Sequence, residues 1–157
     1  MATEAFPLRV MQMIAAELGT IAGVGYVGLD LFGYQQLPKS KFPAVFIVRS
    51  SGGNVETHPA LQQRMELMLL VTGYVLAPGA TPDGIAVARE TFYQAVENAL
   101  LGEGLRARFQ ADFVTSGQQV LPIELDGGPD TDEGQTPPFG YFSLPCRTVL
   151  HYGRGAL

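Results

Sequence analysis

The sequence predicts an α+β fold, in which a mostly antiparallel sheet of four or five strands carries two main helices on one face. Three observations lead to this prediction. Some segments alternate apolar and polar residues, which is typical of strands, and in others apolar residues recur every three or four positions, which is typical of helices. These segments follow the order helix, strands, helix, strands, without the strict alternation that builds parallel sheets. The 157 residues contain neither a repeat nor a linker, so we expect one domain over residues 1–157.

Residues 64–76 are expected to form the central strand. One face of this segment is wholly apolar, with Met65, Leu67, Leu69, Val71, Gly73 and Val75. The other face starts with Arg64 and Glu66 and then becomes apolar, with Met68, Leu70, Tyr74 and Leu76. The first face is predicted to meet the helices. The second is too apolar to be left in water, so either another part of the chain or another subunit should cover it.

Further strands are predicted on both sides of this segment. Residues 42–49, which are mostly apolar, are predicted to form a strand introduced by a proline. Residues 141–152 alternate, and one face of this segment consists of Phe142, Leu144, Cys146, Thr148, Leu150 and Tyr152. Residues 113–125 are interpreted as one long strand or two short ones broken at Gly117 and Pro122. The glycine-spaced residues 23–33 indicate a short strand or an extended arm.

Two helices are predicted from apolar spacing and end signals. Residues 7–18 place Leu8, Met11, Ile14, Ala15 and Leu18 on one face. The second helix should start at Pro82, with Thr81 as its N-cap, and end at Gly102. Residues 105–109 could add a short helical turn. Flexible loops are expected near residues 50–60 and 126–139, where glycine, proline and polar residues gather.

The composition excludes several classes of protein. A net charge of −5 argues against a dedicated nucleic-acid-binding surface. A single cysteine excludes an internal disulfide and a zinc site made of several thiolates. The longest apolar run, residues 67–71, is far too short to cross a membrane, and the N-terminus lacks a secretory pattern. Charged residues make up only 16% against about 25% in ordinary domains, which favours apolar surface hidden in an assembly.

We expect no catalytic residue, no cofactor and no metal. No Gly-x-Ser-x-Gly elbow is present, and neither His58 nor His151 has a second ligand at usable spacing. A hydrolase that uses Cys146 and His151 is the weakest of our hypotheses, because Cys146 falls on the apolar face of its strand.

Several residues are instead candidates for contacts with neighbours or for the lining of a channel. Four acidic residues gather within a glycine-rich stretch: Asp126, Asp130, Asp132 and Glu133. A solvated loop is the favoured interpretation, while a cation site or a surface that repels DNA stays open. His58 lies in the other predicted loop. Tyr93 and Phe139 are expected to be exposed and to serve as aromatic anchors.

One series of segments spans nearly the whole chain: helix 7–18, Phe42-Pro-Ala-Val-Phe-Ile-Val, Glu66-Leu-Met-Leu-Leu-Val-Thr-Gly-Tyr-Val, helix 86–101, Asp126-Gly-Gly, Phe139-Gly-Tyr-Phe and Cys146-Arg-Thr-Val-Leu-His-Tyr. This series resembles the tail terminator (minor tail or tail-completion) proteins of long-tailed bacteriophages. The resemblance implies a virion protein, made in the host cytoplasm, that forms a homo-hexameric ring. The ring would cap the tail tube protein, present a surface to neck or connector proteins, and let DNA pass through its lumen without specific binding.

Two alternatives remain from the sequence. The chain could be a head–tail joining or neck protein of the same particle. It could also be a small binding module whose ligand lies in the glycine-spaced segment.

Overall fold

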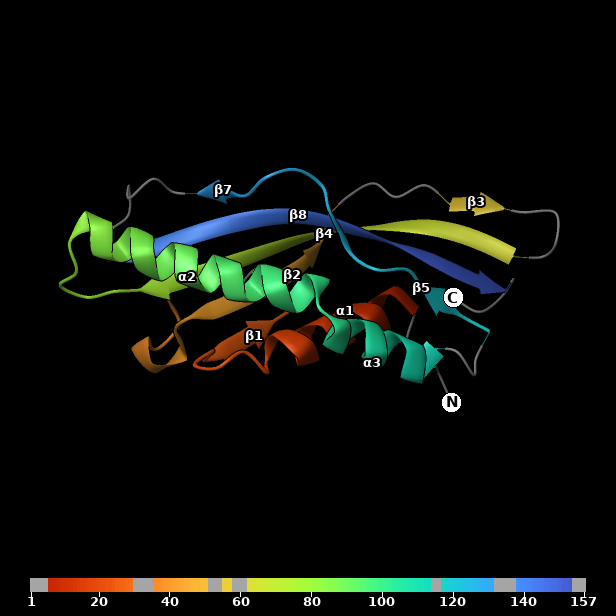
Figure 1. Ribbon diagram of the computed structural model, residues 1–157, viewed down its shortest axis with the longest axis horizontal. Coiled ribbons are helices and arrows are strands. Elements are labelled where there is room, and N and C mark those ends of the chain that lie inside the picture. Colours follow the sequence, from red (N-terminus) through yellow and green to blue (C-terminus); the bar gives the residue numbers. More distant parts are fainter. Residues whose placement is uncertain are drawn as a thin grey trace.

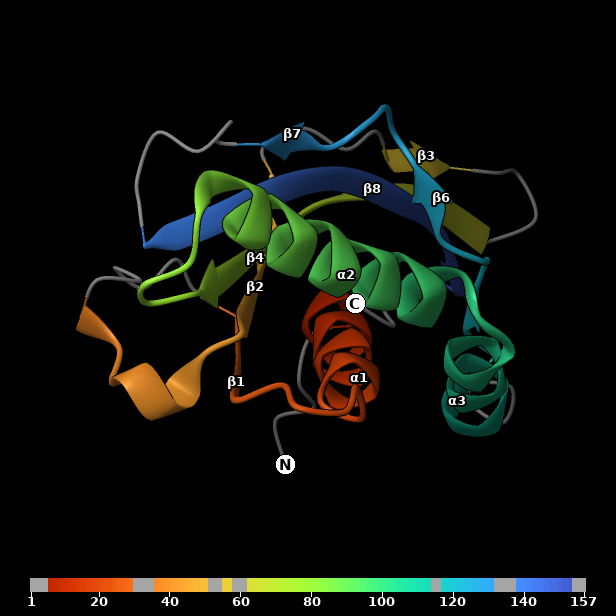
Figure 2. The same ribbon diagram turned by 60° about the vertical axis from the view of Figure 1, so that its left-hand side comes forward.

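The fold is a two-layer α+β arrangement, as predicted, with a mostly antiparallel sheet and helices on one face (Figures 1 and 2). The structure is a computed structural model that describes residues 6–29, 36–50, 55–57, 62–113, 117–131 and 138–153. Its helices are α1 (Phe6–Leu18), the short 3-10 helix η2 (Lys39–Lys41), α2 (Pro82–Leu101) and α3 (Glu103–Phe113). Its strands are β1 (Tyr26–Gly28), β2 (Ala44–Arg49), β3 (Val55–Thr57), β4 (Gln62–Leu76), β5 (Gln119–Val120), β6 (Glu124–Leu125), β7 (Asp130–Thr131) and β8 (Phe139–Gly153).

Two long strands form the centre of the sheet. β4 and β8 pair antiparallel over 15 residues, from Gln62 opposite Gly153 to Leu76 opposite Phe139. The main strand order is β1-β2-β4-β8-β5, with β3 on β4 and with β6 and β7 on β8. Only β1 and β2 pair in parallel among these strands. The predicted central position of β4 is therefore confirmed.

Within the described residues, the sheet has eight strands rather than the expected four or five. β3 and β7 are additional, and the strand expected over residues 113–125 is divided into β5 and β6; each of these four strands contains only two or three residues. Each lies along an edge that β4 or β8 leaves free. Such short segments show no periodicity in sequence, because the long neighbouring strand, rather than their own pattern, holds them in place.

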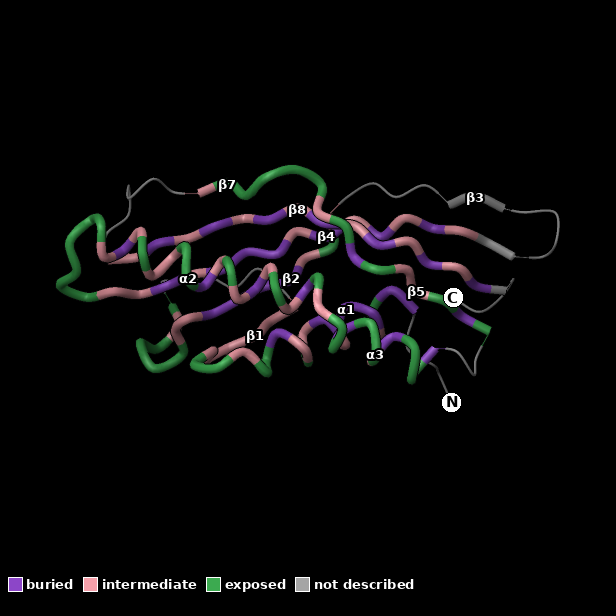
Figure 3. Tube along the Cα trace, viewed as in Figure 1, coloured by how far each residue is buried: buried purple, intermediate pink, exposed green. Residues whose placement is uncertain are grey.

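The hydrophobic core lies between the sheet and the helices. The predicted face of β4 is buried, with Leu67 and Val71 both 0% exposed, and it packs in one cluster with Ile14 of α1 and Phe92 of α2. We call this the inner face of the sheet, and the opposite face the outer face. The directly opposite residues of β8 continue the inner face, and Figure 3 shows the resulting alternation of buried and half-buried positions along both strands.

Helix α2 begins and ends where its sequence signals place it. The Thr81 hydroxyl accepts a hydrogen bond from the Gly84 N–H at 3.2 Å, and Pro82 is the first helical residue. The helix ends at Leu101, directly before Gly102. None of the helices in the described ranges is both long and apolar enough to cross a membrane.

Helix α3 differs from the prediction of a short turn at residues 105–109. It runs for 11 residues and buries Leu105, Phe109 and Phe113, which lie four residues apart. Phe113 stacks on Phe6 of α1 with ring centroids 4.9 Å apart, so it ends a helix instead of starting a strand. The strand prediction for residues 113–125 is correct only as two short strands, β5 and β6.

Candidate interaction surface

The outer face of the sheet carries a row of four aromatic side chains. Tyr26 of β1, Phe46 of β2, Tyr74 of β4 and Tyr141 of β8 come from four neighbouring strands. Their successive ring centroids are 5.7, 5.7 and 5.9 Å apart. We call this set the aromatic row. The spacing lies within the range in which aromatic pairs attract one another.

The strand register explains why the row forms. Ala44 is opposite both Tyr26 and Tyr74, and Tyr74 is opposite Tyr141, so these positions share one face. Ala44 leaves room above the sheet, and the Phe46 ring lies between Tyr26 and Tyr74. Phe46 itself is 0% exposed, whereas the three tyrosines are half-buried. The row is therefore fixed at its base and accessible at its rim.

The row borders a small polar contact and a second aromatic pair. Thr72 and Ser143 share a hydroxyl hydrogen bond of 3.3 Å next to Phe46, and Thr72 is 5% exposed. At the end of the face, the ring of Phe139 lies 5.6 Å from that of Phe42. This end of the outer face is consequently aromatic at its centre, with Asp130 opposite Ser143 at its edge.

The other end of the outer face is charged. Arg64 lies 3.7 Å from Glu66 on β4, and Arg147 of β8 lies 3.2 Å from Glu124 of β6. Both pairs are at least partly open to water, where each contributes at most about 1 kcal/mol to folding. The helices α1, α2 and α3 all lie against the inner face (Figure 2). In the described part of the chain, no helix covers the outer face.

The proposed thiol–histidine pair does not form. Cys146 is 0% exposed on the inner face, while His151, an odd number of residues further along β8, lies on the outer face. Burial raises the pKa of the Cys146 thiol to about 12, so the thiolate that a nucleophile requires is absent at neutral pH. Within the described ranges, no group of three or more His, Cys, Asp or Glu side chains is placed to hold a metal ion.

The two aromatic candidates are less exposed than expected. The ring of Tyr93 lies 5.3 Å from that of Phe142 and packs against the core. Burial raises the pKa of the Tyr93 hydroxyl, and the negative charge of Glu97 adds to this shift. Tyr93 is therefore a half-buried residue of the helix–sheet layer, not an exposed anchor. Phe139 is also half-buried, but it lies on the outer face.

The acidic candidates fall on one edge of the sheet. Asp126 follows β6 and Asp130 begins β7, and both side chains are exposed. The Asp126 N–H donates to the Pro145 carbonyl at 2.9 Å, which fixes this part of the predicted loop against β8. Asp132, Glu133 and His58 lie outside the described residues.

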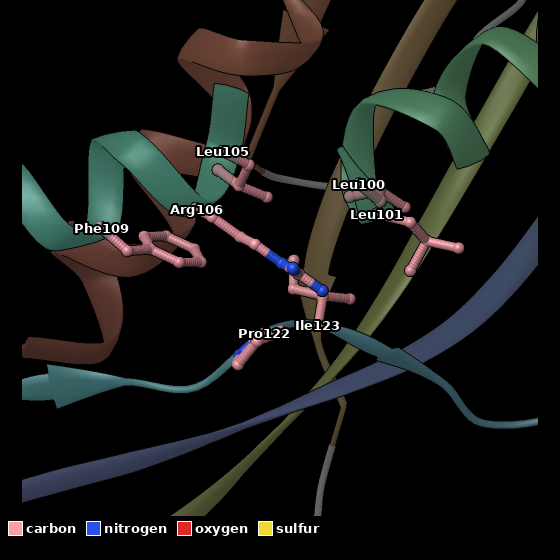
Figure 4. A pocket seen from close by; sticks show the side chains of 7 residues that line it. All are labelled: Leu100, Leu101, Leu105, Arg106, Phe109, Pro122 and Ile123. Atoms are coloured by element: carbon pink, nitrogen blue, oxygen red, sulfur yellow. The ribbon is translucent and has the colours of Figure 1, made fainter. Parts of the chain in front are cut away.

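A hollow that the sequence did not indicate lies between the end of α2, the helix α3 and the segment before β6 (Figure 4). Its volume is about 230 Å³, and apolar residues line most of it, namely Leu100, Leu101, Leu105, Phe109, Pro122 and Ile123. The side chain of Arg106 extends across it in Figure 4, while one guanidinium nitrogen lies 3.2 Å from Glu103. A groove of about 590 Å³ adjoins it and shares Arg106, Phe109 and Pro122. The helical spacing of Leu105 and Phe109 is a sequence signal from which the helix that lines the hollow could have been found.

No protein-family model matches the chain, and no curated protein matches its sequence.

Proposed function

We propose that this chain is a structural virion protein that assembles with copies of itself and caps a phage tail tube as a terminator. The observation that best supports the proposal is the aromatic row on an outer face that no described helix covers. Aromatic residues are enriched at contacts between proteins, and tyrosine is among the residues that most often anchor them, because it adds large contact area at little cost in side-chain entropy.

The balance of charge supports the same proposal. Only 16% of the residues are charged, so the chain has few charged side chains with which to cover a large solvent-exposed surface. When a neighbouring subunit covers this partly exposed aromatic face, the free energy of association becomes more favourable by about 25 cal/mol for each Å² of apolar area buried.

A capping mechanism follows from closed symmetry. A contact between two different patches joins subunits head to tail, and the subunits close into a ring when the rotation permits. A ring with one face matched to the tube end and the other face unlike it would stop growth of the tube. The net charge of −5 would repel DNA phosphates and allow DNA to slide through the lumen without binding.

Solution mass measurement together with negative-stain imaging tests the proposal. We expect rings of about six subunits that bind one end of purified tail tubes and stop their growth. A chain that stays monomeric at high concentration and does not bind tubes would refute it. Rings that bind connector proteins but not tube ends would instead assign the chain to the head–tail joint.

The groove along α3 favours a second candidate function, a small ligand-binding module. Its volume of about 590 Å³ falls within the range of ligand pockets, and Arg106 supplies a cation at its edge. An apolar anion, 8-anilinonaphthalene-1-sulfonate, is a suitable probe. Saturable 1:1 binding that Arg106→Glu, at the edge of the groove, abolishes and the distant Val87→Glu leaves intact would support this candidate. An absence of saturable binding would remove it.

A further inference from the structure

Two lysines mark one edge of the sheet. Lys39 and Lys41 belong to η2, and both side chains are exposed. The backbone of Lys41 packs on Gly25, directly before β1, where an added Cβ would come within 2.7 Å of the Lys41 carbonyl carbon. The Gly25 N–H also donates to the Pro43 carbonyl at 2.8 Å. The two lysines are therefore held beside β1.

Carboxylates mark the opposite edge. Asp126 and Asp130 are exposed beside β7, and the register of β7 on β8 holds Asp130 opposite Ser143. Glu124 also lies on this edge, but Arg147 at 3.2 Å offsets its charge. In Figure 1, β7 and β1 lie on opposite sides of the β4–β8 pair. One sheet thus carries a basic edge and an acidic edge.

Both edges consist of terminal strands. Among the strands that the structure describes, β1 pairs only with β2, and β7 pairs only with β8. A terminal strand directs the N–H and C=O groups of one side away from the sheet, where a strand from another chain can bind them. Where charged residues flank such a terminal strand, a strand from another chain with the opposite charge is favoured and one with the same charge is disfavoured.

We propose that the basic β1–η2 edge of one copy docks against the acidic β7 edge of the next copy. This inference rests on the proposed self-assembly and adds a contact between sheet edges to the contact at the aromatic row. Contact between two basic edges or between two acidic edges would bring like charges together, so the pairing of unlike edges is favoured. Because the two edges differ, each contact leaves one edge of each kind free, and growth ends only when a ring closes.

Charge reversal on each edge tests the interface. The basic-edge variant is Lys39→Glu/Lys41→Glu, and the acidic-edge variant is Asp126→Lys/Asp130→Lys. Each alone should assemble at least about tenfold more weakly than the unmodified chain, as sedimentation velocity would show. An equimolar mixture of the two should assemble again, because every contact between unlike variants pairs opposite charges. The chain with all four substitutions should also assemble.

A matched control separates local from general charge effects. Glu90→Lys/Asp112→Lys makes the same change in net charge as the acidic-edge variant, but at exposed positions of α2 and α3, and it should leave assembly unchanged. Circular dichroism of each variant checks that the fold is retained, and rescue in the mixture is possible only for folded chains.

The outcomes distinguish this interface from self-assembly itself. If the unmodified chain forms rings but the reversed variants assemble equally well, or the mixture is not rescued, the proposed interface is overturned and the ring stands. If the unmodified chain is a monomer at all concentrations, the proposed function is overturned, and the interface with it.

Discussion

Gly73 of β4 lies directly opposite Phe142 of β8, and the ring of Phe142 occupies the space that a side chain at position 73 would need. The same ring packs edge-to-face against Phe92 and Tyr93 of α2, at 5.8 and 5.3 Å between centroids. A glycine on the central strand therefore allows the helix layer and the sheet to meet through one aromatic residue.

Gly73→Ala should destabilise the protein. The new Cβ would overlap the Phe142 ring, which is confined between β4 and α2, so we expect a loss of about 1–3 kcal/mol in the free energy of unfolding. Urea unfolding followed by circular dichroism measures this change. Gly128→Ala is the matched control, since an added Cβ there meets no atom within 4 Å. Equal effects of the two substitutions would contradict the packing described for Gly73.

Tyr152→Phe should stabilise the protein. The Tyr152 ring is 1% exposed, and its hydroxyl finds no hydrogen-bond partner among the described residues. Removing an unsatisfied buried hydroxyl should raise the free energy of unfolding by about 1 kcal/mol. Tyr141→Phe, at a half-exposed tyrosine, should change it by less than about 0.5 kcal/mol. A clear loss of stability in Tyr152→Phe would show that the hydroxyl is bound in solution.

Alkaline pH should destabilise the protein through Cys146. Burial raises the pKa of this thiol to about 12 in the folded chain, against an ordinary value near 9 in the unfolded chain. Between these values only the unfolded chain loses the proton, so stability is complete below about pH 9 and falls as pH rises. The slope for one such group is about 1.4 kcal/mol per pH unit.

Unfolding measurements from pH 8 to 11 on the unmodified chain and on Cys146→Ala test this effect. Burial also raises the pKa values of Tyr93 and Tyr152, but both chains contain these tyrosines, so their effect on stability is the same in the two profiles. The difference between the two profiles therefore isolates the thiol. Parallel profiles would show that Cys146 is not buried as described.

Tyr74→Thr/Tyr141→Thr should weaken self-assembly without unfolding the monomer. Threonine suits a strand, but it removes two rings of the aromatic row from the outer face. Sedimentation velocity should show at least about a tenfold weaker association, as expected for loss of interface anchors. Val87→Thr removes an apolar side chain that is 66% exposed on α2, and it should leave association unchanged. Association that depends on Val87 and not on the tyrosines would assign the contact to the helix layer.

The parts of the fold that the sequence predicts are those with a long, regular apolar pattern. The two faces of β4 and the stripes of α1 and α2 follow from spacing alone, and the Thr81 cap and Gly102 locate the ends of α2. The predicted stripe of the N-terminal helix is correct at Met11, Ile14 and Leu18. Leu8 was placed on this stripe but is exposed, and Val10 is buried instead.

The remaining parts depend on contacts between distant segments. Phe113 resembles the start of a strand in sequence, but its stacking on Phe6 makes it the end of α3. The aromatic row needs the register of four strands, which no local pattern gives. Tyr93 appeared exposed from its position on α2, and only the neighbouring Phe142 of β8 accounts for its burial.

The pairing of β4 with β8 also affects how the chain can fold. Helices α2 and α3 and the strands β5 to β7 all lie between the two partners in sequence, so the central ladder joins distant residues. Folding is slowed because a long loop must close before the two strands can form hydrogen bonds. Domains dominated by contacts between residues distant in sequence fold on the order of milliseconds to seconds. On the ribosome, β4 is synthesised long before β8. Until β8 arrives, a 15-residue strand whose inner face is apolar from Met65 to Val75 lacks its main partner, which makes this stage of synthesis the one most open to aggregation.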